Sequence, residues 1–359
     1  MVMGVQMSFR WFGEGDPVTL EHIRQIPGVT GVVSAVYDVP AGEEWPYEKI
    51  VSLKRRIEEK GLTLAAIESV PVHEEIKMGG SGRDRYIENF RRTLRNLARA
   101  GVSVVCYNFM PVFDWTRTDL TFRLPDGSST LAYDEEIAQK MDPLRGELEL
   151  PGWDTSYDKG ELRALLEAYR GVTEDDLWEH LRYFLIKVID TADELGIRMA
   201  IHPDDPPWSI FGLPRIITSR ESLERLIGLV DSPCNGLTFC TGSLGADPNN
   251  DLPAMIRTFG GKGRIHFAHV RNIQITGHRS FVEIAHCSSE GSVDMYEVMK
   301  AFWEVGFDGP MRPDHGRMIW GETGRPGYGL YDRAMGAVYL KGIWEGFERS
   351  SYQGRAGLG

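Results

Sequence analysis

Short apolar runs alternate with longer segments of helical periodicity along this 359-residue chain, and no other sequence feature limits its possible folds as strongly. Strands alternating with helices pair in parallel through right-handed crossovers. The alternation therefore predicts an α/β fold. The eight predicted strands are residues 5–12, 29–39, 62–72, 102–112, 197–202, 236–241, 264–271 and 310–314.

Helix end signals separate these strands. Apolar residues recur at helical spacing in 47–60, and Gly61 follows, where glycine commonly ends a helix. One helix is predicted to open at Thr19, and the others span 47–60, 85–100, 173–195, 220–230, 252–259, 293–305 and 329–347. The residues predicted to cap helix N-termini are Thr173 with Asp176, Ser219, Asp251 and Ser292.

Eight strand–helix units form either a closed barrel or an open, doubly wound sheet. No Gly-x-Gly-x-x-Gly motif follows an early strand, which disfavours the dinucleotide-binding form of the open sheet. Polar residues stand at the ends of several successive strands, as catalytic groups do in barrels. We therefore predict a (β/α)8 TIM barrel, one domain over residues 1–359, with a polar insertion at 114–171 after the fourth strand.

The negative net charge of the chain disfavours binding to nucleic acids. The chain has 40 Lys and Arg against 52 Asp and Glu, a net charge of −12, which repels nucleic-acid phosphates. The run Arg91, Arg92, Arg95 and Arg99 is interpreted as a solvated helix face, while Trp178 is assigned to the core. The apolar runs are too short to span a bilayer. We expect neither a nucleic-acid nor a membrane partner.

The cysteines and the N-terminal residues indicate the cellular compartment in which we expect the protein. Cys106, Cys234, Cys240 and Cys287 show no Cys-x-x-Cys spacing, which favours reduced thiols. No basic region followed by an apolar core appears at the N-terminus. We expect a cytoplasmic protein. We also expect a homo-oligomer, a dimer or a tetramer, although no sequence feature fixes the number of subunits.

Metal-binding residue types end the last four predicted strands. They are His202, Cys240, His269 and Asp314, separated by 38, 29 and 45 residues, or about one strand–helix unit each. Consecutive barrel strands would bring them to one point. Two imidazoles, a thiolate and a carboxylate suit a divalent ion such as Mn²⁺, Fe²⁺, Co²⁺ or Zn²⁺.

The seventh strand carries two histidines. Because side chains alternate along a strand, Phe267, His269 and Arg271 share one face, and His266 lies on the other. His269 is also nearer the C-terminal end. We predict that His269 is the ligand and keep His266 as the alternative.

Several segments resemble mannonate dehydratases. They are 201–207 (IHPDDPP), 238–245 (TFCTGSLG), 265–271 (IHFAHVR), 293–299 (VDMYEVM), 311–316 (MRPDHG) and 326–328 (PGY), with 7–13 (MSFRWFG) at the first strand. The resemblance implies a xylose-isomerase-like barrel that converts D-mannonate to 2-keto-3-deoxy-D-gluconate with Mn²⁺ or Fe²⁺. It assigns the same four metal ligands and places the catalytic acid/base pair on His315 and Tyr328.

Dehydration of this sugar acid requires loss of the C2 proton and of the C3 hydroxyl, so it needs a base and an acid. We expect Tyr328 to be the base and His315 the acid, with the reverse assignment left open. Arg10, Arg271 and Arg312 are candidates to bind the substrate carboxylate. Arg271 is favoured among them, because it shares the face of His269. Asn108 is expected to contact substrate hydroxyls.

Other functions of a metal-binding barrel compete with this one. A metal-dependent sugar isomerase or epimerase uses the same fold, but such sites are generally richer in carboxylates. An apurinic-site endonuclease needs a basic groove, which the net charge opposes. A barrel that only binds a partner would not need the four metal-binding side chains. The dehydratase is therefore the expected function.

Overall fold

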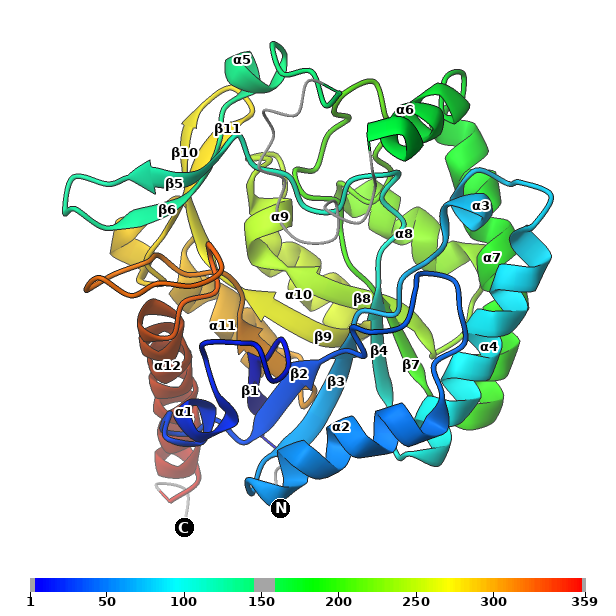
Figure 1. Ribbon diagram of the computed structural model, residues 1–359. Helices are drawn as coiled ribbons and strands as arrows, with labels where there is room; N and C mark the ends of the chain where they lie inside the picture. The colour runs from blue at the N-terminus through cyan, green and yellow to red at the C-terminus, as the bar shows by residue number, and fades with distance from the viewer. Residues whose placement is uncertain (1–3, 145–158, 357–359) are drawn as a thin grey trace.

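A closed barrel of parallel strands forms the centre of the computed structural model, which describes residues 4–144 and 159–356 (Figure 1). The predicted (β/α)8 barrel is confirmed. Around the barrel the order is β1 (Gln6–Arg10), β2 (Gly31–Ser34), β3 (Thr63–Glu68), β4 (Val104–Tyr107), β7 (Arg198–Ile201), β8 (Asn235–Cys240), β9 (Ile265–Val270) and β12 (Pro310–Pro313), and β12 pairs with β1.

Helices surround this barrel. The long ones follow the barrel strands as predicted, and short ones lie in the loops (Figure 1). They are α1 (Leu20–Arg24), α2 (Tyr47–Glu59), α3 (Glu74–Lys77), α4 (Arg83–Arg99), α5 (Glu135–Ala138), α6 (Lys159–Ala168), α7 (Glu174–Leu195), α8 (Arg220–Leu229), α9 (Thr241–Gly245), α10 (Leu252–Gly261), the 3₁₀ turn η2 (Ser288–Glu290), α11 (Met295–Glu304) and α12 (Tyr331–Ala356).

The barrel strands are buried on both faces. Val105 and Met199 belong to the main core, which the surrounding helices share. The residues beside them in sequence, Val104, Cys106 and Ala200, join a small separate cluster that fills the barrel interior. Several strands are shorter than predicted, because buried loop residues such as Val112 extend the apolar run beyond β4.

A second sheet, which the sequence analysis did not predict, lies beside the barrel (Figure 1). β5 (Asp119–Arg123) and β6 (Ser129–Tyr133) come from the predicted insertion, and β10 (Asn272–Gly277) and β11 (Ser280–Ile284) follow β9. The strands are antiparallel in the order β10–β11–β6–β5. The sheet thus joins two chain segments far apart in sequence. Residues 145–158 of the predicted insertion lie outside the described residues.

Most predicted helix caps are confirmed. Thr173 forms a capping box with Asp176, and Ser219 and Asp251 cap α8 and α10. The prediction for Ser292 is wrong. The backbone N–H of Ser292 bonds to Ile273 and its side chain accepts from Ile275, so α11 begins later, with Asp294 as its cap.

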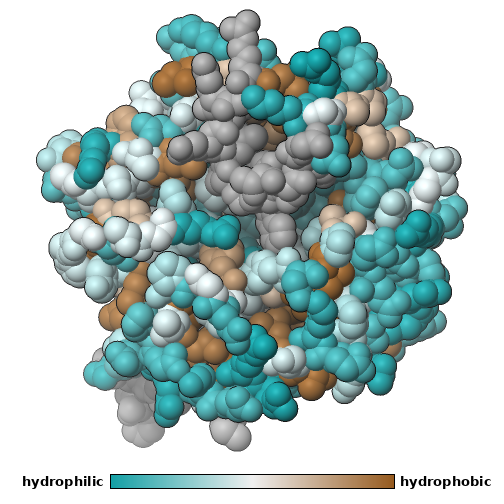
Figure 2. All heavy atoms as spheres, viewed as in Figure 1, coloured by the Kyte–Doolittle hydropathy of each residue, from teal (hydrophilic) through white to brown (hydrophobic). Residues whose placement is uncertain are grey.

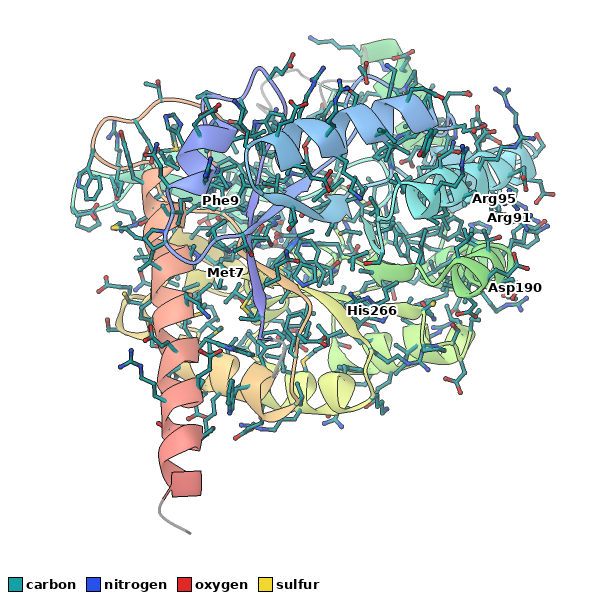
Figure 3. All side chains as sticks on the ribbon, turned by 90° about the horizontal axis from the view of Figure 1, so that it is seen from below. Met7, Phe9, Arg91, Arg95, Asp190 and His266 are labelled. Atoms are coloured by element: carbon teal, nitrogen blue, oxygen red, sulfur yellow. The ribbon has the colours of Figure 1, made fainter. Side chains whose placement is uncertain are left out.

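The positions of the surface arginines and of Trp178 are as the sequence predicts. Hydrophilic residues cover most of the face shown in Figure 2. Arg91 and Arg95 lie at the edge of the molecule in Figure 3 and pair with Glu88 on the same helix. Trp178 is buried, as expected. Within the described residues, no helix has the length and apolar character needed to cross a membrane. The four cysteines are free thiols.

The cap of α7 gives a stability prediction. Thr173→Ala is expected to lower the free energy of unfolding by about 1 kcal/mol, because the N–H of Asp176 loses its acceptor. Thr173→Ser keeps the hydroxyl and is expected to remain close to the parent protein. Denaturant unfolding of the three proteins is the measurement, and equal loss in both variants would contradict the cap as the cause.

Candidate functional site

Polar side chains gather at the C-terminal end of the barrel because the last inward-facing positions of its strands are polar. Seven barrel strands contribute at least one, either within the strand or just after it. These residues are Arg10 (β1), Glu68 (β3), Asn108 (after β4), His202 (after β7), Cys240 (β8), His269 (β9), Arg312 (β12) and Asp314 (after β12).

A pocket opens at this end of the barrel. Both predicted catalytic residues, His315 and Tyr328, line it. Arg10, Glu68, Asn108, Asp114, Trp115, His202, Arg312, Asp314 and Arg325 also line it. Of the predicted site residues, Cys240, His269 and Arg271 lie behind this lining.

His202, Cys240 and His269 form a group suited to a metal ion. One ligand atom from each lies within 4.8 Å of the others. Asp314 lies beside them, with one oxygen 3.5 Å from the Cys240 sulfur and the other 3.8 Å from Nδ1 of His269. The structure therefore brings the four predicted ligands together.

The two imidazoles face each other through one nitrogen each. Nε2 of His202 lies 3.1 Å from Nδ1 of His269. The other nitrogens have oxygen neighbours, since Nδ1 of His202 is 2.7 Å from the Pro203 carbonyl and Nε2 of His269 is 3.2 Å from the Glu68 carboxylate. Such neighbours fix the ring orientation of metal-binding histidines. Two nitrogens bound to one ion at about 2.1 Å stand roughly 3 Å apart, so the pair fits a shared cation.

The Cys240 thiol lies 3.5 Å from an oxygen of Asp314, to which it can donate, and it also accepts hydrogen bonds from Ser243. The backbone N–H of Ser243 lies 3.5 Å from it, and the Ser243 hydroxyl donates to it at 3.1 Å. His266, the alternative ligand, does not join this group. Its Nδ1 bonds to the Met199 carbonyl at 2.7 Å, and burial lowers its pKa to about 4.

His315 and Tyr328 are in contact. Nε2 of His315 lies 3.0 Å from the Tyr328 hydroxyl oxygen, and the indole ring of Trp115 packs against the imidazole. Both residues are buried. Burial raises the pKa of Tyr328, and the negative charge of Asp314 adds to this effect. The Nε2 atom and the hydroxyl oxygen are close enough to share one proton in a hydrogen bond at the wall of the pocket.

The three candidate arginines differ in their partners. Arg271 contacts Asp205 at 2.6 Å and Asp314 at 2.8 Å, and it also contacts Glu283. Arg312 likewise contacts two carboxylates, those of Glu68 and Asp314. The partners of Arg271 thus lie within the protein, although sequence analysis favoured it for substrate binding.

Arg10 differs from the other two arginines because it has one carboxylate neighbour among the described residues, where Arg271 has three and Arg312 has two. Its nearest carboxylate oxygen, on Glu68, is 3.4 Å away. Its Nε and Nη1 form no hydrogen bond with the described residues, although the side chain is buried. A buried guanidinium with unused donors at a pocket wall is suited to an anionic ligand.

Sequence analysis missed four charged residues of the site. Glu68, Arg117, Asp205 and Glu283 are paired through buried or nearly buried side chains. Burial by itself would raise the pKa of Glu283, but the charges of its neighbours, Arg271 first among them, lower it to about 2. The available signals were weak: Asp205 follows the His202 motif, and Glu283 interrupts an apolar run.

Comparison with known proteins gives a consistent result. The family model described as D-mannonate dehydratase (UxuA) matches residues 5–353. Mannonate dehydratase 2 of Halalkalibacterium halodurans is 63% identical over 341 residues, covering 95% of this chain and 99% of the relative. The mannonate dehydratase of Streptococcus uberis is 59% identical, with 95% and 98% covered.

Comparison with solved structures points to the same family. The crystal structure of mannonate dehydratase from Streptococcus suis serotype 2 superposes with a TM-score of 0.91 at 50% identity, covering 97% of this chain and 96% of that one. An L-ribulose 3-epimerase superposes with a TM-score of 0.56 at 14% identity, covering 97% of each chain, which shows the fold alone. With a family model matched over nearly its whole length, this chain belongs to the D-mannonate dehydratase family.

Proposed function

We propose that this protein is an enzyme that removes water from D-mannonate to give 2-keto-3-deoxy-D-gluconate. The observation that carries the proposal is the contact between His315 and Tyr328 in a pocket that two of the proposed metal ligands, His202 and Asp314, also line. Family membership supports it. A sugar isomerase or epimerase is supported only by distant likeness of fold.

A divalent cation, Mn²⁺ or Fe²⁺, is proposed as the cofactor, held by His202, Cys240, His269 and Asp314. The facing ring nitrogens and the sulfur that accepts hydrogen bonds support this ligand set. A thiolate and a carboxylate would balance the charge of the ion. When bound, the cation would supply electrophilic stabilisation of negative charge on the substrate oxygens.

His315 and Tyr328 are proposed to move the two protons of the reaction. Tyr328, as the phenolate that a nearby bound cation would favour, takes the C2 proton as the base, and the protonated His315 gives a proton to the C3 hydroxyl as the C3–O bond breaks. Water leaves, and the C2–C3 double bond forms an enol. The enol then becomes the 2-keto acid when C3 gains a proton and the C2 hydroxyl loses one. Their 3.0 Å contact allows the pair to exchange a proton between turnovers.

Arg10 is proposed to bind the carboxylate of D-mannonate. Its unused donors at the pocket wall support this role. Arg312 and Asn108 also line the pocket and are proposed to contact the substrate. For Arg271 we propose a different role from the one expected from sequence. Its contacts with Asp205, Glu283 and Asp314 suit it to hold those carboxylates in place.

Metal removal tests the cofactor. Chelator-treated protein is expected to lose formation of 2-keto-3-deoxy acid from D-mannonate, and added Mn²⁺ or Fe²⁺ is expected to restore it. Cys240→Ser should lower bound metal, because the thiolate ligand is lost, whereas Cys234→Ser, outside the proposed ligand set, should not. Metal analysis and a product assay are the measurements. Full turnover by metal-free protein would refute the proposal, while isomerised aldose from an aldose substrate would favour the isomerase.

The two catalytic roles are separable by hydrogen exchange. His315→Asn and Tyr328→Phe are each expected to lower kcat by about 10²–10⁴-fold while metal content is retained. In D₂O, His315→Asn should still exchange the C2 proton of D-mannonate, because the base remains, and Tyr328→Phe should not. The opposite pattern would reverse the assignment. Near-normal turnover in either variant would remove that residue from the mechanism.

Substrate binding by Arg10 is testable by substitution. Arg10→Gln should lower kcat/KM for D-mannonate by about 10- to 100-fold, because a charged hydrogen bond is worth about 1.5–3 kcal/mol. Arg10→Lys keeps the charge and should retain more activity. Steady-state kinetics with bound metal verified is the measurement. Unchanged kcat/KM in both variants would place the carboxylate elsewhere.

A further inference from the structure

We propose that Glu283, on β11 of the second sheet, is a positioning residue for His315. The inference rests on the proposed function, in which His315 and Tyr328 transfer protons. Both oxygens of the Glu283 carboxylate lie close to Nδ1 of His315, at 2.9 and 3.0 Å. The other ring nitrogen, Nε2, lies 3.0 Å from the Tyr328 hydroxyl. Nδ1 also lies 3.4 Å from Nη1 of Arg271, and Nε2 lies 3.9 Å from an oxygen of Asp314, but the contacts with Glu283 and Tyr328 are the shorter ones.

This arrangement determines which ring nitrogen carries the mobile proton. A carboxylate only accepts hydrogen bonds, so Nδ1 must carry a hydrogen and donate it to Glu283. The same holds whether the imidazole is neutral or protonated. The proton that comes and goes is therefore confined to Nε2, which faces Tyr328. A buried carboxylate fixes the tautomer and orientation of the histidine of a serine protease in the same way.

The Glu283 carboxylate is itself held firmly. Arg117 contacts its Oε1 through Nε at 3.0 Å and Nη2 at 2.7 Å, and Arg271 contacts the same oxygen. Arg117 also forms two hydrogen bonds, of 2.8 and 3.0 Å, with Asp205. These side chains are almost fully buried. Rotation of the carboxylate would break these buried ion pairs, so its direction toward His315 is held by them.

Glu283 and Arg117 reach the site from outside the barrel. Glu283 lies on β11, where its backbone carbonyl accepts a hydrogen bond from Thr130 on β6. Arg117 lies just before β5. Neither side chain lines the pocket, so Glu283 acts through His315 and does not touch the substrate. The second sheet therefore has a function in the reaction, since it supplies the support for a catalytic histidine.

Kinetics of Glu283 variants test the role. Glu283→Gln is expected to lower kcat by about 10²–10⁴-fold, with KM for D-mannonate and metal content nearly unchanged. The two guanidinium groups attract the amide oxygen, which turns the amide NH₂ toward Nδ1 and favours the wrong tautomer. Glu283→Asp keeps the charge and should recover part of kcat. Glu74→Gln, which removes a buried carboxylate paired with Lys77, is the matched control and should keep normal kcat.

The tautomer itself is measurable without turnover. In metal-free protein labelled with ¹⁵N-histidine, the His315 signals, identified by their absence in His315→Asn, should show a protonated Nδ1. In Glu283→Gln they should shift toward a protonated Nε2. The same tautomer in both proteins, or a kcat loss matched by Glu74→Gln, would overturn the positioning role. If the parent protein does not convert D-mannonate, the proposed function fails, and the ¹⁵N signals still decide whether Glu283 orients His315.

Discussion

A continuous series of buried ion pairs crosses the C-terminal end of the barrel, and the geometry of the site depends on it. Arginines and carboxylates alternate along it in the order Arg10, Glu68, Arg312, Asp314, Arg271, then Asp205 and Glu283, which both contact Arg117. Burying a single charge costs several kcal/mol unless it is paired. The loss of one member therefore leaves its neighbours uncompensated, which makes the series resist rearrangement.

This series connects the two halves of the proposed chemistry. Asp314 is a proposed metal ligand, and it is held by Arg312 and Arg271. Arg271 also contacts Glu283, which orients His315. The metal-binding group and the proton-transfer pair are therefore attached to the same arginine. Preorganised groups of this kind need not reorganise as charge develops in the reaction.

The barrel and the second sheet make different contributions to the site. Barrel strands end in the proposed metal ligands, because the inward-facing side chains of neighbouring strands converge at one end. The second sheet brings in Glu283 together with its partner Arg117, from segments that lie on either side of β7, β8 and β9 in the sequence. A distant sugar epimerase shares the fold at 14% identity, so the fold alone does not select the reaction.

The sequence by itself determined the barrel and the residues at its strand ends. Alternating apolar and helical segments are local patterns, and the face of His269 follows from the two-residue period of a strand. The motif around Asp314 and His315 is equally local, and its six consecutive residues resemble the family without reference to any distant segment. Residues such as Asp176 at the start of α7 were predictable for the same reason, since a helix cap involves only neighbouring residues.

Only the tertiary structure decided which charges meet. Arg117 and Glu283 are 166 residues apart, and no local pattern pairs them. The second sheet forms through antiparallel contacts between β6 and β11, which depend on how two distant segments fold against the barrel. Arg10 and Arg271 carry the same charge in the sequence, but Arg271 meets three carboxylates, whereas Arg10 meets only that of Glu68 among the described residues. The partners of a buried charge are set by three-dimensional packing, and these partners determine whether it binds a substrate or supports its neighbours.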